Sequence, residues 1–187
     1  MVRSALLIVF GIARAGVALR PVPRRAVLGG VSSASLAVLA PVDAARAISG
    51  GGKDYAEADI KGADFSGQNL NSKDFSGADG VDAKFAGAKL RGARFFKADM
   101  ERADFSGADL TSASMENCNL AGANLKGAVA EGAAFTKTLT EAESIRDVDF
   151  TDAVIQPYVQ KELCGRPDAV GTNPATGADT RDSLFCQ

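Results

Sequence analysis

Large apolar residues recur every five positions along residues 58–135 of the chain. They occupy almost every multiple of five, and a small residue, in most cases alanine, stands two positions before each of them. Gly80 and Ala130 interrupt the large series, whereas Gln68, Lys73 and Cys118 interrupt the small one. Most of the remaining positions are polar, so apolar and polar residues alternate in a fixed order.

A period of five requires a chain that turns once in every repeat. Neither an α-helix nor a regular strand keeps such a period on one face. In an extended segment, residues two apart point the same way, so the small and the large residue can both face inward. Glycine often stands two positions after the large residue, as Gly67 follows Phe65, where a tight turn can use it. The pattern therefore predicts a coil with one repeat per side.

The repeat resembles the pentapeptide-repeat family. The motif A(D/N)(L/F)xG stands at residues 103–107 and 123–127, among many near-consecutive matches. The resemblance implies an all-β solenoid, a right-handed quadrilateral β-helix, in which four repeats form one coil of twenty residues. We expect about four to five coils, followed by a short disulfide-linked α-helical C-terminal cap.

Coils of twenty residues predict which side chains stack. One inward ladder contains Phe65, Phe85 and Phe105, and a second ladder faces it from the opposite side of the coil. Gly80 leaves a gap among the large residues, and a lost side chain costs about 2 to 4 kcal/mol unless neighbours collapse into the space. The members of the second ladder are Phe75, Phe95, Met115 and Phe135.

The outward charges mostly alternate in sign from coil to coil, and this alternation favours register and solubility. The exception is Asp59, Asp79 and Asp99, which stack like on like, with Glu101 close by. These carboxylates are either tolerated by solvent or mark a contact for a cation or a basic partner. Phe96 points outward and is either a candidate contact residue or a covered surface residue.

Residues 1–47 have the composition of a cleaved targeting segment. They hold two short apolar runs, at 5–12 and 26–40, and neither has the roughly 20 residues of a membrane span. Arg24 and Arg25 before the second run resemble a twin-arginine signal, and Ala45 and Ala47 form an A-x-A cleavage site. We expect cleavage after Ala47 and no stable membrane insertion afterwards. Two signals in tandem suggest plastid import to the thylakoid lumen, with a bacterial periplasm as the alternative.

The remaining chain divides into three parts. Residues 48–57 are expected to form an N-terminal cap, residues 58–155 the β-helix and residues 156–187 a helical cap. The period weakens within residues 138–155, which form either a further coil or a helix that begins near Thr140. Residues 157–163 have helical composition with proline in the first turn, and residues 179–186 are expected to form a short second helix. Together they supply the terminal cap that a solenoid needs.

The three cysteines have different expected roles. Cys164 and Cys186 flank the loop of the cap, and a disulfide between them implies an oxidising compartment. Cys118 occupies a small inward position, where it replaces alanine as a buried thiol. Three cysteines without histidine do not make a tetrahedral zinc site, so no metal is expected.

The C-terminal residues indicate which members of the family the chain resembles most. Residues 164–167 and 171–184 resemble the end of thylakoid-lumen pentapeptide-repeat proteins. The resemblance implies a twin-arginine signal, a short β-helix and a disulfide-linked helical cap. It implies no established biochemical activity.

Charge and composition limit the function. Residues 48–187 hold 15 basic and 22 acidic residues, a net charge of −7, which argues against phosphate contacts with nucleic acid. The chain has no histidine, so the usual acid–base group is missing. No catalytic, metal-binding or cofactor-binding residue is predicted.

Three functional hypotheses follow. The first is a non-enzymatic structural or protein-interaction module of the thylakoid lumen with an unknown protein partner, as a monomer or an end-to-end dimer. The second is a DNA-mimic topoisomerase inhibitor, an activity that the family resemblance implies for some bacterial members. The third is an enzyme or cofactor carrier that uses the cap loop at residues 172–177.

Overall fold

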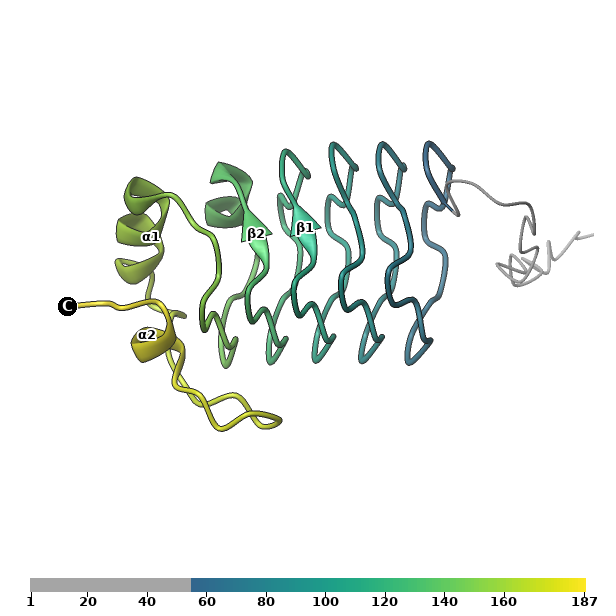
Figure 1. Ribbon diagram of the computed structural model, residues 1–187. Helices are drawn as coiled ribbons and strands as arrows, with labels where there is room; N and C mark the ends of the chain where they lie inside the picture. The colour runs from purple at the N-terminus through teal and green to yellow at the C-terminus, as the bar shows by residue number, and fades with distance from the viewer. Residues whose placement is uncertain (1–54) are drawn as a thin grey trace, which may run out of the picture. The chain divides into compact units, whose positions relative to one another are not determined.

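A computed structural model describes residues 55–187 of the chain. These residues form a solenoid followed by two helices at its C-terminal end (Figure 1). The predicted signal residues Arg24, Arg25, Ala45 and Ala47 lie outside the described residues, as do residues 48–54 of the expected N-terminal cap.

Parallel bridges join residues that are twenty positions apart. Asp64 pairs with Lys84, which in turn pairs with Asp104, and equivalent bridges occur every five residues along the chain. Within residues 55–187, the two regular strands are β1 (Ser114–Met115) and β2 (Ala134–Phe135), which pair in parallel with Ser114 opposite Ala134. The chain therefore winds as a four-sided solenoid with the spacing that the sequence predicts.

A four-residue turn joins one side of the solenoid to the next. At the corner formed by residues 60–63, the Ala63 amide donates to the Ile60 carbonyl at 3.0 Å, and Gly62 has a φ of 61°. Residues other than glycine adopt the same conformation at other corners, for example Lys97 (φ 57°) and Arg102 (φ 55°). Each such residue pays a steric cost of about 1 kcal/mol or more. The ladders of hydrogen bonds on both sides of each corner impose this conformation.

The core consists of the small and the large residue of each repeat. Ala63 and Phe65 are buried, whereas Asp64 between them is exposed. The Phe65, Phe85 and Phe105 rings stack with centroids 5.0 Å apart, as predicted. Phe75 belongs to the facing ladder and meets Phe85 edge-on at 5.6 Å. Two aromatic ladders therefore fill the first coils and pack against each other.

The space beside Gly80 is filled by Met100, so the gap expected from the sequence is closed. A Cβ at position 80 would lie 2.6 Å from the Met100 sulfur and 2.8 Å from its terminal methyl group. Met100 is fully buried. The flexible thioether side chain bends into the room that a large residue occupies in the other coils.

Gly80→Ala is expected to destabilise the protein by about 1 to 3 kcal/mol, because the new methyl group overlaps the Met100 side chain. Urea unfolding followed by circular dichroism measures the change. The double variant Gly80→Ala/Met100→Ala should recover part of the loss relative to Met100→Ala alone. Strictly additive losses would show that Met100 does not fill this space.

Residues 138–155 mostly continue the coils, which is one of the two structures that the sequence left open, and no α-helix begins near Thr140. The 3-10 helix η1 (Lys137–Glu141) replaces the first side of this part, with Leu139 buried. After η1 the repeat resumes, because Ser144, Asp149 and Val154 form parallel bridges with the residues twenty positions earlier. The solenoid therefore continues to the start of the cap.

The cap contains two short helices. Helix α1 (Pro157–Cys164) begins with proline in its first turn, ends before Gly165 and packs against η1. Helix α2 (Thr180–Ser183) begins after Asp179, whose carboxylate accepts hydrogen bonds from the amides of residues 181 and 182. A disulfide joins Cys164 to Cys186, the pairing expected from the sequence. It ties the C-terminus to the end of α1.

Candidate interaction surfaces

The interior of the coils is packed with apolar side chains. Inward residues from Ile60 to Phe150 form one continuous core, and most are completely buried. Cys118 lies in this core as a buried free thiol, and burial raises its pKa. Among the described residues, no cluster of potential ligands could hold a metal ion, and no helix is long and apolar enough to span a membrane.

We call Asp59, Asp79, Asp99 and the nearby Glu101 the acidic strip, and the structure contains the predicted stacking of its three aspartates. Asp59, Asp79 and Asp99 form consecutive parallel bridges on one side of the solenoid. The Lys61 ammonium lies 2.7 Å from the Asp79 carboxylate, and its hydrogen bond and charge interaction with Asp79 raise the lysine pKa. The Asn119 amide donates to Asp99 at 2.9 Å. Asp79 and Asp99 therefore have side-chain partners that sequence stacking alone did not suggest, and Asp59 accepts from the Lys61 amide at 3.3 Å.

Glu101 is also engaged. It pairs with Arg102, and this guanidinium forms a second, bidentate contact with Asp82 at 2.8 and 2.9 Å. The hydrogen bond from Arg102 lowers the pKa of Asp82. Glu101 thus belongs to a charge network at the corner of the solenoid.

Phe96 is half-buried at the preceding corner of the same coil. The Lys97 ammonium lies 5.2 Å from the centroid of the Phe96 ring, within the range of a cation–π contact. This contact fits the interpretation of Phe96 as a covered surface residue. The side chain is still partly accessible to a partner.

Arg166 fastens the cap to the last turn of the solenoid. Its guanidinium donates to the carbonyls of Thr140 and Ala142 at 2.9 Å each. It also forms two hydrogen bonds with Asp168, whose carboxylate accepts from the Ile145 amide at 2.9 Å. We call Arg166 and Asp168 the cap clamp, because together they satisfy backbone groups that a further coil would otherwise satisfy.

Asn173 fastens the cap loop to the side of the solenoid. It is 1% exposed, and its amide nitrogen donates to the carbonyls of Gly127, Ala128 and Asp147 at 2.9 to 3.1 Å. Its side-chain oxygen accepts from the amides of residues 175 and 176. The cap loop that the sequence offered as a cofactor site therefore has a structural role in the fold.

The Asp168 pKa is lowered in the folded protein. Burial alone would raise this pKa, but the hydrogen bonds from Arg166 and from the Ile145 amide, together with the arginine charge, outweigh it. A lowered folded pKa stabilises the protein above the ordinary value of 3.8, and this contribution is lost as the pH falls through the folded pKa.

The cap is therefore expected to loosen in acid, as protonation of Asp168 breaks the cap clamp. Hydrogen exchange of the Ile145 amide, measured from pH 7 down to pH 3 and corrected for intrinsic rates, should show protection that falls below the ordinary carboxyl pKa. Asp168→Asn should lower protection at pH 7 and flatten its dependence on pH. A wild-type profile no steeper than that of Asp168→Asn would contradict this role.

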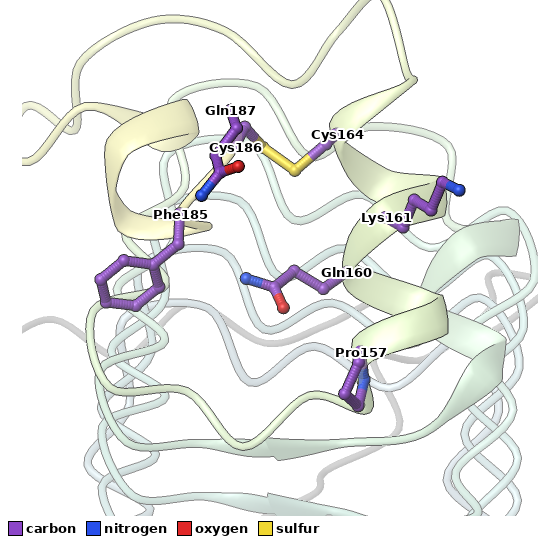
Figure 2. A pocket seen from close by; sticks show the side chains of 7 residues that line it. All are labelled: Pro157, Gln160, Lys161, Cys164, Phe185, Cys186 and Gln187. Carbon is purple, nitrogen blue, oxygen red and sulfur yellow. A yellow bond between two sulfur atoms is a disulfide. The ribbon is translucent and has the colours of Figure 1, made fainter.

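Exposed apolar side chains gather near the cap, which the sequence analysis did not identify as an interaction site. Val154, Tyr158 and Phe185 are 65%, 56% and 71% exposed. A groove of about 350 Å³ lies between α1 and the C-terminus, where Gln160 projects from α1 toward the segment that carries Phe185 (Figure 2). The other residues that line it are Pro157, Lys161, Cys164, Cys186 and Gln187. The exposure of Phe185 depends on the path of the C-terminal segment, which has no periodic signal.

Comparisons with known proteins identify the family. The sequence model of the pentapeptide repeats matches in eight copies, over residues 58–95, 92–127 and 103–139. A solved pentapeptide repeat protein from the thylakoid lumen of Arabidopsis thaliana is 39% identical, with a TM-score of 0.65; the match covers 71% of this chain and 91% of that protein. The chain therefore belongs to the pentapeptide-repeat family, whose members fold as right-handed quadrilateral β-helices and are generally structural or interaction modules.

Two further solved structures are more distant. A pentapeptide repeat protein from Nostoc PCC 7120 is 29% identical and has a TM-score of 0.47; the match covers 56% of this chain and 85% of that one. QnrB1, a plasmid-mediated fluoroquinolone resistance protein, is 20% identical and has a TM-score of 0.27, with coverage of 56% and 77%. No curated protein matches the chain.

Proposed function

We propose that the protein is a non-enzymatic interaction module of the plastid thylakoid lumen. The observation that carries this proposal is the filled interior. Inward positions along the coils hold packed apolar side chains, so the outer surface is the part of the solenoid that can recognise another molecule. Long hydrogen-bonded ladders and a fastened cap make that surface a rigid one.

Three observations support the location. The chain is 39% identical to a protein of the Arabidopsis thylakoid lumen. The Cys164–Cys186 disulfide fits an oxidising compartment. The sequence of residues 1–47, with Arg24 and Arg25, fits a cleaved signal. We therefore also propose that this segment is removed from the mature protein. The similarity to QnrB1, at 20% identity, adds no support to the topoisomerase-inhibitor hypothesis.

The side that carries Asp59, Asp79, Asp99, Glu101 and Phe96 is the first candidate contact surface. Carboxylates outnumber basic groups on it, so the surface would attract a basic partner. Lys61 and Asn119 already engage two of these carboxylates, which leaves Asp59 and the partly exposed Phe96 ring as the more available groups.

A pull-down from lumen extract tests this role. The protein should retain a defined partner, and Asp79→Lys or Phe96→Ala should weaken retention, whereas Lys84→Ala on another side should not. Retention of the same partner by both strip variants would remove this surface from the proposal. If the wild-type protein, its surface intact, retained no partner from lumen extract, the proposed role itself would fail.

A further inference from the structure

The last side of the solenoid before α1 has an unpaired strand edge. On this side, the Val154 amide donates to the Ala133 carbonyl at 2.8 Å, and the Phe135 amide donates to the Val154 carbonyl at 3.0 Å. The equivalent groups one coil later are the Ala153 carbonyl and the Ile155 amide. Neither forms a hydrogen bond within residues 55–187. We call residues 152–155 the open edge.

The cap closes other sides of this coil and leaves the open edge free. Asp168 accepts from the Ile145 amide, and the Ser183 hydroxyl accepts from the Phe150 amide at 3.1 Å. On a further side, α1 packs against η1. The cap therefore supplies substitute partners for most of a missing coil. The open edge is a local gap in this cover.

The open edge borders an apolar hollow. A cavity of about 150 Å³ is lined in part by Phe150, Ala153 and Ile155 from the solenoid and by Phe185 from the C-terminal segment. Val154 in the middle of the edge is 65% exposed, and the Phe185 ring is 71% exposed. An unpaired carbonyl and amide beside exposed apolar side chains form a template for another strand.

The charge of Asp152, at the corner where the open edge begins, favours a basic side chain on the incoming strand. Asp152 is exposed, is the first residue of the open edge and is the only charged residue among residues 152–155. The described residues as a whole are acidic, with 14 basic against 21 acidic side chains. A basic side chain on an incoming strand would complement Asp152.

We propose that the open edge binds an extended segment of a partner protein, which adds as one further parallel strand. The partner residue opposite Val154 donates its amide to the Ala153 carbonyl and accepts from the Ile155 amide. Inward and outward side chains alternate along a strand, and this alternation determines which residues of the partner segment fit. They are a small residue over Ala153, a large apolar residue over Ile155 and a basic residue beside Asp152.

The shape of the cap favours a slender strand over a second copy of the chain. Helices α1 and α2 extend past the last coil at this end (Figure 1). They would meet the coil or the cap of a second copy, whereas a single extended strand is narrower. Gln160 of α1 and Leu184 also line the cavity beside the open edge, and Gln160 donates to the Leu184 carbonyl. The open edge also lies in a different coil from the acidic strip, so separate variants distinguish a failure of this inference from a failure of the proposed role.

A defined peptide tests the inference. The probe is a fluorescein-labelled peptide, Gly-Arg-Ala-Thr-Leu-Ser, in which threonine is the residue opposite Val154. Fluorescence anisotropy with the full chain should show saturable binding. A control peptide with proline in place of threonine lacks the central amide and should bind at least about tenfold more weakly.

Variants of the protein locate the binding site. Asp152→Lys should weaken the probe about fivefold or more, whereas Glu116→Lys, an equal change of charge at another corner, should stay within about twofold. Circular dichroism checks that both variants fold. The proposal is overturned if the probe does not saturate at millimolar concentration or if the proline peptide binds equally well. It is also overturned if the chain forms a dimer that the probe does not disperse.

Discussion

Phe85→Ala should lower the free energy of unfolding by about 3 to 5 kcal/mol. The ring is fully buried and stacks on Phe65 and Phe105 with centroids 5.0 Å away on each side. It also meets Phe75 and Phe95 edge-on. Because the bridged coils above and below hold these neighbours in place, the cavity cannot collapse easily. Urea unfolding followed by circular dichroism measures the loss.

Phe96→Ala is the matched control for this variant. The two phenylalanines stand in neighbouring coils, but Phe96 is half-buried on the outside, next to Lys97. Removal of its ring should cost less than about 1 kcal/mol, because little packed volume is lost. Similar losses in the two variants would mean that the inside and outside positions are wrongly assigned.

Arg166→Ala should lower the free energy of unfolding by about 2 to 4 kcal/mol and release the cap first. The substitution removes the donors from the Thr140 and Ala142 carbonyls and leaves Asp168 without its charged partner. Hydrogen exchange should show faster exchange of the Ile145 amide, which Asp168 holds. Limited proteolysis should cut the cap before the coils.

Two further variants control for charge and geometry. Arg146 is exposed and follows Ile145 directly in the sequence. Arg146→Ala removes the same charge as Arg166→Ala and should leave both the free energy of unfolding and the exchange of the Ile145 amide nearly unchanged. Arg166→Lys keeps the charge, but its single ammonium cannot reproduce the forked contacts and should rescue only part of the loss. Full recovery with lysine would show that charge alone holds the cap.

The coils could be predicted from the sequence because each one repeats the same contacts twenty residues later. A residue's position in the repeat therefore determines whether its side chain faces in or out, as Phe85 and Lys84 show. The exceptions depend on side-chain flexibility and local helix formation. Met100 bends into the space beside Gly80, and η1 replaces one side after Phe135.

The fastening of the cap could not be predicted in the same way. Arg166 and Asn173 reach backbone carbonyls that are 23 to 46 residues away, and no period relates them to their partners. A buried asparagine in a polar loop has the same sequence signature as an exposed one. The disulfide was accessible to prediction because the remaining cysteine, Cys118, stands at an inward position.

The candidate surfaces likewise include features that could be predicted from the period of the sequence and features that could not. The stacking of Asp59, Asp79 and Asp99 follows directly from the period, and the structure contains it. The partners of these carboxylates come from a corner and from the next coil, and the period alone does not specify them. The open edge depends on which backbone groups the cap leaves uncovered, so it became visible only when the path of the cap was known.

Cysteine cross-linking tests the twenty-residue coil most directly. In a Cys118→Ala background, Lys84→Cys and Asp104→Cys place two thiols on bridged neighbours, about 4.8 Å apart between Cα atoms, which a disulfide can span. Lys84→Cys with Arg94→Cys places them on different sides of the solenoid. Mass spectrometry after mild oxidation should find the new disulfide in the first pair alone. A disulfide in the second pair but not in the first would contradict the four-sided solenoid.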